Sequence, residues 1–239
     1  MSQIEPPEGG ATDPRILLAA ANNAAWCTSM CRAHCLSTHQ DRRRWWSTSR
    51  TPLYYPDVVT LDPATTGADV LQGIDTSGGC SVKDSFSTLD LTSDGFRLWF
   101  EATWIHLPAA SLTAPRSGLR SAVVRDRTAL RQWQRVWGDG GPDLFVPPLL
   151  EDPDVRLISV SEQADVAAVA VLNRSAGAVG ITNLVIARSR AVEIWTAVVA
   201  VAAHLFPGLA IVGYEQQDEL ANAVAAGFAE IGPLRVWGS

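Results

Sequence analysis

The chain has 239 residues, of which 47% are hydrophobic and 18% charged, a composition that excludes an intrinsically disordered protein. Its formal net charge of -6 disfavours non-specific nucleic-acid binding, which needs an excess of cations. No apolar stretch is long enough to span a bilayer and the acidic start lacks the order of a signal peptide, so we expect a cytoplasmic protein without nucleic-acid or membrane partners.

The first predicted element is a helix over Arg15–Cys35, after a tail over residues 1–14 that we expect to be disordered. Asp13 is a typical N-cap, and the proline that follows it suits a first helical turn. The helix carries three cysteines four residues apart on one face. They could bind a soft metal together with His39, or act as a redox pair. We favour packing as small apolar residues, because zinc sites usually draw ligands from two separate segments. The three cysteines are Cys27, Cys31 and Cys35.

The rest of the N-terminal half is punctuated by polar turns. Residues 36–57 are rich in arginine and proline and predict a long loop. A short strand at 57–63 and a short helix at 67–77 follow. Within residues 96–107, apolar side chains alternate with mostly polar ones, and this period of two predicts a strand. We therefore expect an N-terminal α/β region over residues 15–110.

The loops of this half hold three candidate substrate ligands, Tyr54, Tyr55 and Lys83. Lys83 is the only lysine of the chain, and the paired tyrosines could hold a planar group. Packed tyrosines and a solvent-exposed lysine are the simpler interpretation.

The C-terminal half is more regular. After a linker over residues 111–125, an amphipathic helix at 125–138 precedes three strands, a long apolar helix, a strand, a helix and a closing strand. The two strands within 165–187 are almost continuously apolar, which predicts a sheet covered on both faces.

This order of elements over residues 126–239 resembles the GNAT (general N-acetyltransferase) superfamily. The best local match is NAVAAGFAEIGPLRVW, with Asn222, the pair Gly227-Phe228 and a strand behind them. The resemblance implies an α/β fold with a mixed, mostly antiparallel sheet flanked by helices. The N-terminal half resembles a partial copy of the same fold, which would make a tandem or one-and-a-half GNAT arrangement.

The resemblance implies an N-acyltransferase that passes an acyl group from acetyl-CoA or another acyl-CoA directly to a small amine, without a metal. The acyl carbonyl would be held near a bulge of the central strand, and the pyrophosphate at the start of the helix that begins at Ala191. The implied cofactor-binding residues are Val185, Ile186, Ala187, Arg188, Arg190, Ala191, Val192 and Asn222.

Two departures from the family pattern affect the predicted chemistry. The segment ARSRAVEIW has no glycine where the family has a glycine turn, and the last helix lacks the tyrosine that protonates the leaving thiolate. Tyr214 is the nearest replacement for that acid, and Glu215 or Glu162 would be the base. A catalytically inactive GNAT-fold binding or regulatory protein is therefore an alternative, and a cysteine-based metal or redox sensor is a third. We leave a homodimer open.

Overall fold

The structure, a computed structural model, describes residues 12–109, 118–138, 144–163, 165–187 and 189–239. The predicted tail up to residue 11, residues 111–117 of the predicted linker and Arg188 lie outside the described residues. The strands in the described part are β1 (Thr38–Gln40), β2 (Arg44–Ser47), β3 (Val58–Thr60), β4 (Ser81–Asp84), β5 (Arg97–Leu107), β6 (Leu119–Val123), β7 (Val155–Glu162), β8 (Asp165–Ser175), β9 (Ala178–Ile186), β10 (Ala210–Glu215) and β11 (Ala229–Gly238).

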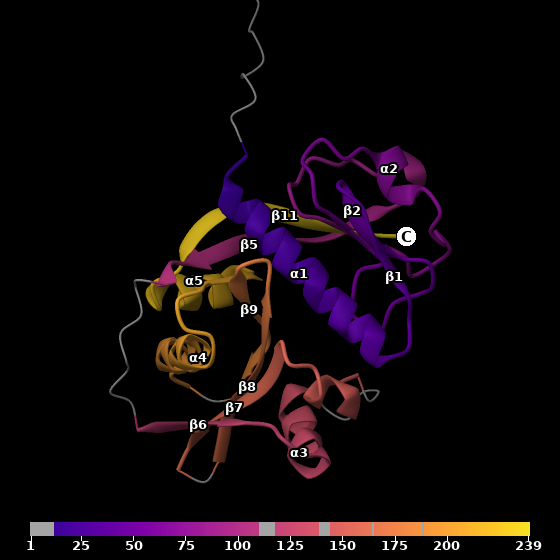
Figure 1. Cartoon of the computed structure of the whole chain (residues 1–239). Coiled ribbons are helices and arrows are strands. Elements are labelled where there is room, and N and C mark those ends of the chain that lie inside the picture. The colour runs from indigo at the N-terminus through magenta and orange to yellow at the C-terminus, as the bar shows by residue number, and fades with distance from the viewer. Residues whose placement is uncertain (1–11, 110–117, 139–143, 164, 188) are drawn as a thin grey trace, which may run out of the picture.

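These strands form one 11-stranded sheet in the order β1-β2-β3-β4-β11-β5-β10-β9-β8-β7-β6 (Figure 1). Two neighbouring pairs, β3–β4 and β9–β10, are parallel, and the other pairs are antiparallel. The predicted mixed, mostly antiparallel sheet flanked by helices is confirmed.

Helices cover both faces of the sheet (Figure 1). Side chains of α4 (Ala191–Leu205) and α5 (Gln217–Ala225) form one hydrophobic core with β7, β8 and β9. On the opposite face, α1 (Pro14–Ala33) and α3 (Arg127–Trp137) pack in a second core. The interior of β8 is buried on both sides, as its continuous apolar sequence predicts. A small helix, α2 (Gly67–Leu71), packs Val70 in a core with Val58 of β3 and Val82 of β4. Among the described residues, none of the helices combines the length and apolarity that a bilayer span requires.

The two halves of the chain share strands. β5 comes from the N-terminal half, yet it lies between β10 and β11, which come from the C-terminal half. β11 in turn pairs with β4 on its other edge. The sheet is therefore continuous from one half to the other. The boundaries at residues 110 and 125 stay predictions.

Three local expectations were wrong. The first helix ends at Ala33, because Cys35 takes a left-handed conformation with φ 59°, and its side chain is exposed instead of sharing the buried face of Cys27 and Cys31. The expected loop over 36–57 contains the hairpin of β1 and β2. The expected linker over 111–125 contains β6, which pairs with β7. Strands of three to five residues are too short to show a clear period.

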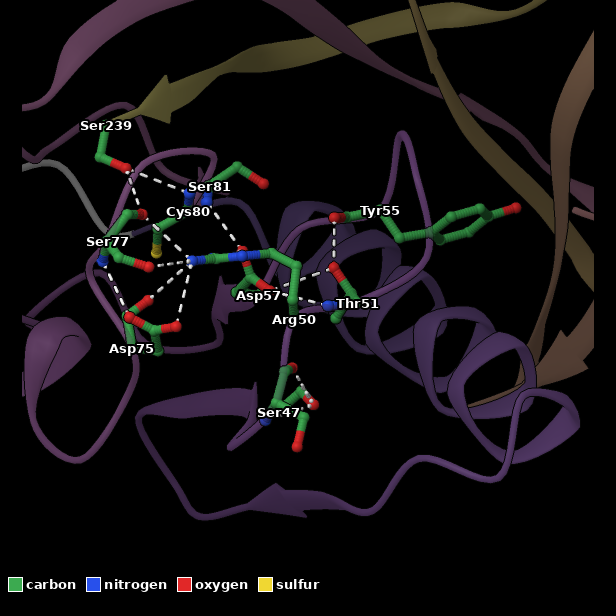
Figure 2. A network of polar contacts seen from close by, with 11 residues as sticks. Ser47, Arg50, Thr51, Tyr55, Asp57, Asp75, Ser77, Cys80, Ser81 and Ser239 are labelled. Carbon is green, nitrogen blue, oxygen red and sulfur yellow. Dashed lines mark hydrogen bonds and ion pairs between the residues drawn. The ribbon is translucent and has the colours of Figure 1, made fainter. Parts of the chain in front are cut away.

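A polar network fixes the loop that carries Tyr55 (Figure 2). The guanidinium of Arg50 donates to the carboxylate of Asp57 at 2.7 Å and to the backbone oxygen of Ser77 at 3.1 Å. The other carboxylate oxygen of Asp57 accepts from the backbone N–H of Thr51, whose hydroxyl donates to the backbone oxygen of Tyr55 at 2.6 Å. Because these groups are mostly buried, the loop is held in one conformation and the ring of Tyr55 points towards the C-terminal strands.

Helix α1 lies unusually close to β9, and two buried asparagines make the contact. The side-chain amide of Asn22 donates to the backbone oxygens of Asn173, Ser175 and Ala178 at 3.2 to 3.3 Å. The amide of Asn173 donates back to Asn22, at 3.0 Å to its side-chain oxygen. A Cβ at Gly180 would lie 2.1 Å from the side-chain oxygen of Asn22. Only glycine fits under the helix at this point.

We expect Gly180→Ala to lower the free energy of unfolding by about 1 to 3 kcal/mol, because the new methyl group displaces buried amides from their hydrogen bonds. Urea unfolding measures the change. Gly78→Ala is the matched control, since its Cβ would meet nothing within 4 Å. Equal stability of the two variants would show that the close approach of α1 imposes no constraint.

Candidate functional site

The candidate site begins where two parallel strands part. β9 and β10 pair only through Ala178–Gly180 and Ala210–Val212. Both strands are described to their ends, and they continue to Ile186 and Glu215 without further pairing to each other. Each keeps its outer partner, β8 for β9 and β5 for β10. The backbone groups that face the gap therefore make no hydrogen bonds between β9 and β10.

A bulge lies on β9 beside this gap. Its register against β8 shifts between Val169 and Val171, which leaves Asn183 and Leu184 opposite a single residue. Asn183 has a left-handed backbone with φ 53°. The bulge is thus earlier than the stretch 185–187 that we expected to hold the acyl carbonyl. The N–H of Ala187 already donates to the backbone oxygen of Ala167 at 2.8 Å, so Ala187 cannot serve that role as built.

Polar side chains from both halves gather on the α1 face of the gap. The ammonium of Lys83 lies 4.1 Å from the ring centroid of Tyr214, on β10, and donates to Asn23 of α1 at 3.0 Å. The hydroxyl of Tyr55 donates to the side chain of Asn183 at 3.2 Å. Burial raises the pKa of Tyr55 well above its ordinary value, so the hydroxyl stays protonated.

The structure thus brings Tyr55, Lys83 and Tyr214 to one face of the sheet, although they are far apart in sequence. Tyr54 does not join them. Its side chain is 76% exposed and packs edge-on against Trp137 of α3. Asn222 lies half-buried in α5, on the opposite face.

Glu215 points away from Tyr214, because successive side chains of a strand point to opposite faces. It therefore faces α5, and Glu219 on that helix is close enough to affect it. Burial first, and then repulsion by Glu219, raises the pKa of Glu215 from 4.5 to about 8. At neutral pH this carboxyl is largely protonated.

The amino end of α4 is occupied by an ion cluster. Arg190 is the N-cap, in a left-handed conformation with φ 82° that favours glycine. Its guanidinium donates to Glu162 at 2.6 Å and lies 3.5 Å from Glu193. Glu162 is thus a partner of Arg190 and not a free base. Ala191 and Val192 are half-buried in the first turn, whose N–H groups receive no side-chain cap.

These features fit an acyl-CoA unequally. The gap and the bulge offer unpaired backbone groups for the acyl end. The start of α4 has free N–H groups for a phosphate, but two carboxylates already neutralise its arginine. Arg190 could bind a diphosphate only by giving up Glu162 and Glu193.

The cysteines of α1 show no reactive chemistry. Burial raises the pKa of Cys27 to about 11 and, together with repulsion by Cys27, raises that of Cys31 to about 12. Thiols with such pKa values are poor nucleophiles at neutral pH. Within the described ranges, no three His, Cys, Asp or Glu side chains are arranged to hold a metal ion.

Sequence reasoning missed the asparagines of the site. Asn22, Asn23, Asn173 and Asn183 come from one helix and two strands and meet only in the folded chain. An asparagine within an apolar strand, as in AVLNRS, is the one signal that could have found them, because a buried amide needs partners.

No family model and no curated protein matches the sequence. Solved structures do resemble the fold. A GCN5-related N-acetyltransferase from Kribbella flavida aligns with a TM-score of 0.65 at 12% identity, over 92% of this chain and 95% of its own. A functionally unknown conserved protein from Staphylococcus epidermidis aligns with a TM-score of 0.63 at 10% identity, over 85% and 94%. A GCN5-related N-acetyltransferase from Sphaerobacter thermophilus gives 0.51 at 11%, over 71% and 62%. The likeness extends well beyond residues 126–239, and the chain has a GNAT-like fold.

Proposed function

We propose that this chain is an acyl-CoA-dependent N-acetyltransferase that acts on a small amine by direct transfer. The observation that carries the proposal is the gap between β9 and β10 with the bulge at Asn183 and Leu184 beside it. A gap of this kind lets the extended, acyl-bearing arm of the cofactor pass between the two strands and bind their unpaired backbone groups. When bound, the cofactor supplies an activated acyl thioester.

The residues around the gap have different roles on the two faces of the sheet. The bulge places backbone N–H groups where they can polarise a carbonyl oxygen. Glu215 holds a proton on the face of α4 and α5, where the sequence resemblance implies that the cofactor binds. We therefore assign it as the proton donor to the leaving thiolate, instead of the base that the sequence suggested. Tyr214 orients the acceptor on the α1 face.

A GNAT-fold binding or regulatory protein without catalysis is the second candidate. The ion cluster at the start of α4 favours it, because Glu162 and Glu193 occupy the arginine that a diphosphate would need.

Thiol release separates the two candidates. We expect free CoA to appear when acetyl-CoA is mixed with the protein and members of a small-amine panel, as followed with a thiol reagent. Gly213→Val should abolish release, because a Cβ at Gly213 would lie 3.0 Å from the backbone oxygen of Ile181 and narrow the gap. Gly78→Val is the control. Calorimetric binding of CoA without thiol release from any amine would favour the second candidate.

The charge at α4 gives a second prediction. Glu193→Gln should tighten CoA binding by about two- to fivefold, since each charge at a helix start contributes about 0.3 to 1 kcal/mol. Isothermal titration calorimetry measures it. Glu230→Gln, at an exposed position of β11, is the matched control. Unchanged or weaker binding by Glu193→Gln would place the diphosphate elsewhere.

The raised pKa of Glu215 gives a third. As a proton donor it must be protonated, so kcat should fall as the pH rises through about 8, and Glu215→Gln should lose this limb together with most of the rate. A limb that rises near pH 8 would instead make Glu215 the base.

The same group affects stability with a defined sign. The pKa of Glu215 is higher in the folded than in the unfolded protein. Its contribution to the free energy of unfolding is therefore complete below about pH 4.5 and is lost as the pH rises through about 8. The melting temperature of Glu215→Gln should therefore rise relative to the parent protein between these two values. A constant difference would contradict the shift.

A further inference from the structure

We propose that Lys83 binds a carboxylate on the acceptor, so that the preferred acceptors are small amino acids or similar amino-carboxylates. This inference rests on the function proposed above and adds the class of substrate. It comes from the environment of the ammonium group.

Lys83 is buried without an anion. Its side chain is 4% exposed, in the interior of the sheet on β4. Its ammonium group donates to the amide oxygen of Asn23 and lies over the aromatic ring of Tyr214. Throughout the described part of the chain, no carboxylate forms an ion pair with it. The neighbouring Asp84 instead accepts from the backbone N–H groups of Phe86 and Leu89.

An ammonium group in this state has only part of the interactions that would offset the cost of burying its charge. It has three N–H donors, and the hydrogen bond to Asn23 uses one of them. An amide oxygen and a ring face together compensate a buried charge less well than an anion does. Methionine would fill the same volume without the cost of burying a charge. The ammonium group is thus ready to receive a negatively charged group.

The two contacts of Lys83, Asn23 and Tyr214, indicate the side from which an anion would approach. Tyr214, which lies under the ammonium, also lines a cavity with Asn22, Asn23, Gly180 and Gly213. Lys83 itself does not line this cavity, which measures about 10 Å³, room for about one water molecule, so a carboxylate reaches the ammonium only if the half-exposed ring of Tyr214 moves aside. Thr182 and Tyr214 are half-exposed and form its outer side. An amino acid that approaches from this side would direct its carboxylate towards Lys83 and keep its amine at the gap.

Asn22 and Asn173 do not offer an alternative anion site. The amide donors of Asn22 are directed at three backbone oxygens, and those of Asn173 at Asn22. The size of the cavity and the single cation favour a carboxylate over a phosphate.

Matched acceptors test the inference. Each amino acid is compared with its amide, for example glycine with glycinamide and alanine with alaninamide, which keep the amine and remove the negative charge. We expect the parent protein to prefer the acids in kcat/KM by about tenfold or more, the ratio that one charge-assisted hydrogen bond supports. Lys83→Met should lose this preference, with kcat/KM for each acid falling to the value for its amide. Arg120→Met, which removes the same charge from an exposed position on β6, should keep the preference.

Stability measurements separate a binding role from a structural one. Lys83→Met should melt at the same or a higher temperature than the parent protein, because it removes a buried charge. Lys83→Gln serves as the second variant if Lys83→Met does not fold. Equal use of acids and amides by the parent protein, or a loss of stability that matches the loss of preference, would overturn the inference.

If the proposed function is wrong, the acceptor assay gives a different result than if only the carboxylate site is wrong. In the first case no acceptor releases CoA. Calorimetric titration with glycine and alanine then decides the role of Lys83 by itself: binding that disappears in Lys83→Met supports the carboxylate site, and absence of binding by the parent protein overturns it.

Discussion

The parting of β9 and β10 is the constraint on which the site depends. Parallel strands pair weakly and must be joined by a crossover, here α4, so their pairing need not continue along their full length. The two strands can separate because β8 and β5 hold their outer edges. The bulge at Asn183 then turns the end of β9 away from the ladder. The result is a gap lined by unpaired backbone groups, although both strands stay paired along their outer edges.

Helix α1 fixes the position of this gap relative to the strands of the N-terminal half. Asn22 anchors it to the ends of β8 and β9, and Asn23, one residue later, contacts Lys83 of β4. The Arg50 network fixes the loop that carries Tyr55 against the same face. Polar groups of the two halves thus meet beneath one helix, and the ammonium group of Lys83 keeps spare hydrogen-bonding capacity there.

The sequence predicts the C-terminal elements well, because their hydrophobic periods are long. The amphipathic α3 and the apolar run of α4 need no tertiary information. The site is less predictable. Asn22 and Asn173 are 151 positions apart, and neither lies in a motif. The sequence suggested Tyr214 as the acid and Glu215 as one of two candidate bases, whereas strand alternation places the two side chains on opposite faces; the period of β10 already contained this information. The bulge at Asn183 and Leu184, which lies before the predicted carbonyl-binding stretch of Val185 to Ala187, has no local sequence signal that we recognise.

The interleaving of β5 and β11 has a consequence for how the chain folds. β5 is made early but pairs with β10 and β11, which are made more than 100 residues later. Pairings so distant in sequence have a high contact order and slow the search for the native state. Until β11 emerges from the ribosome, one edge of β4 and one edge of β5 have no partner, which exposes nascent molecules to aggregation. Production of this protein should therefore benefit from slow synthesis and chaperones.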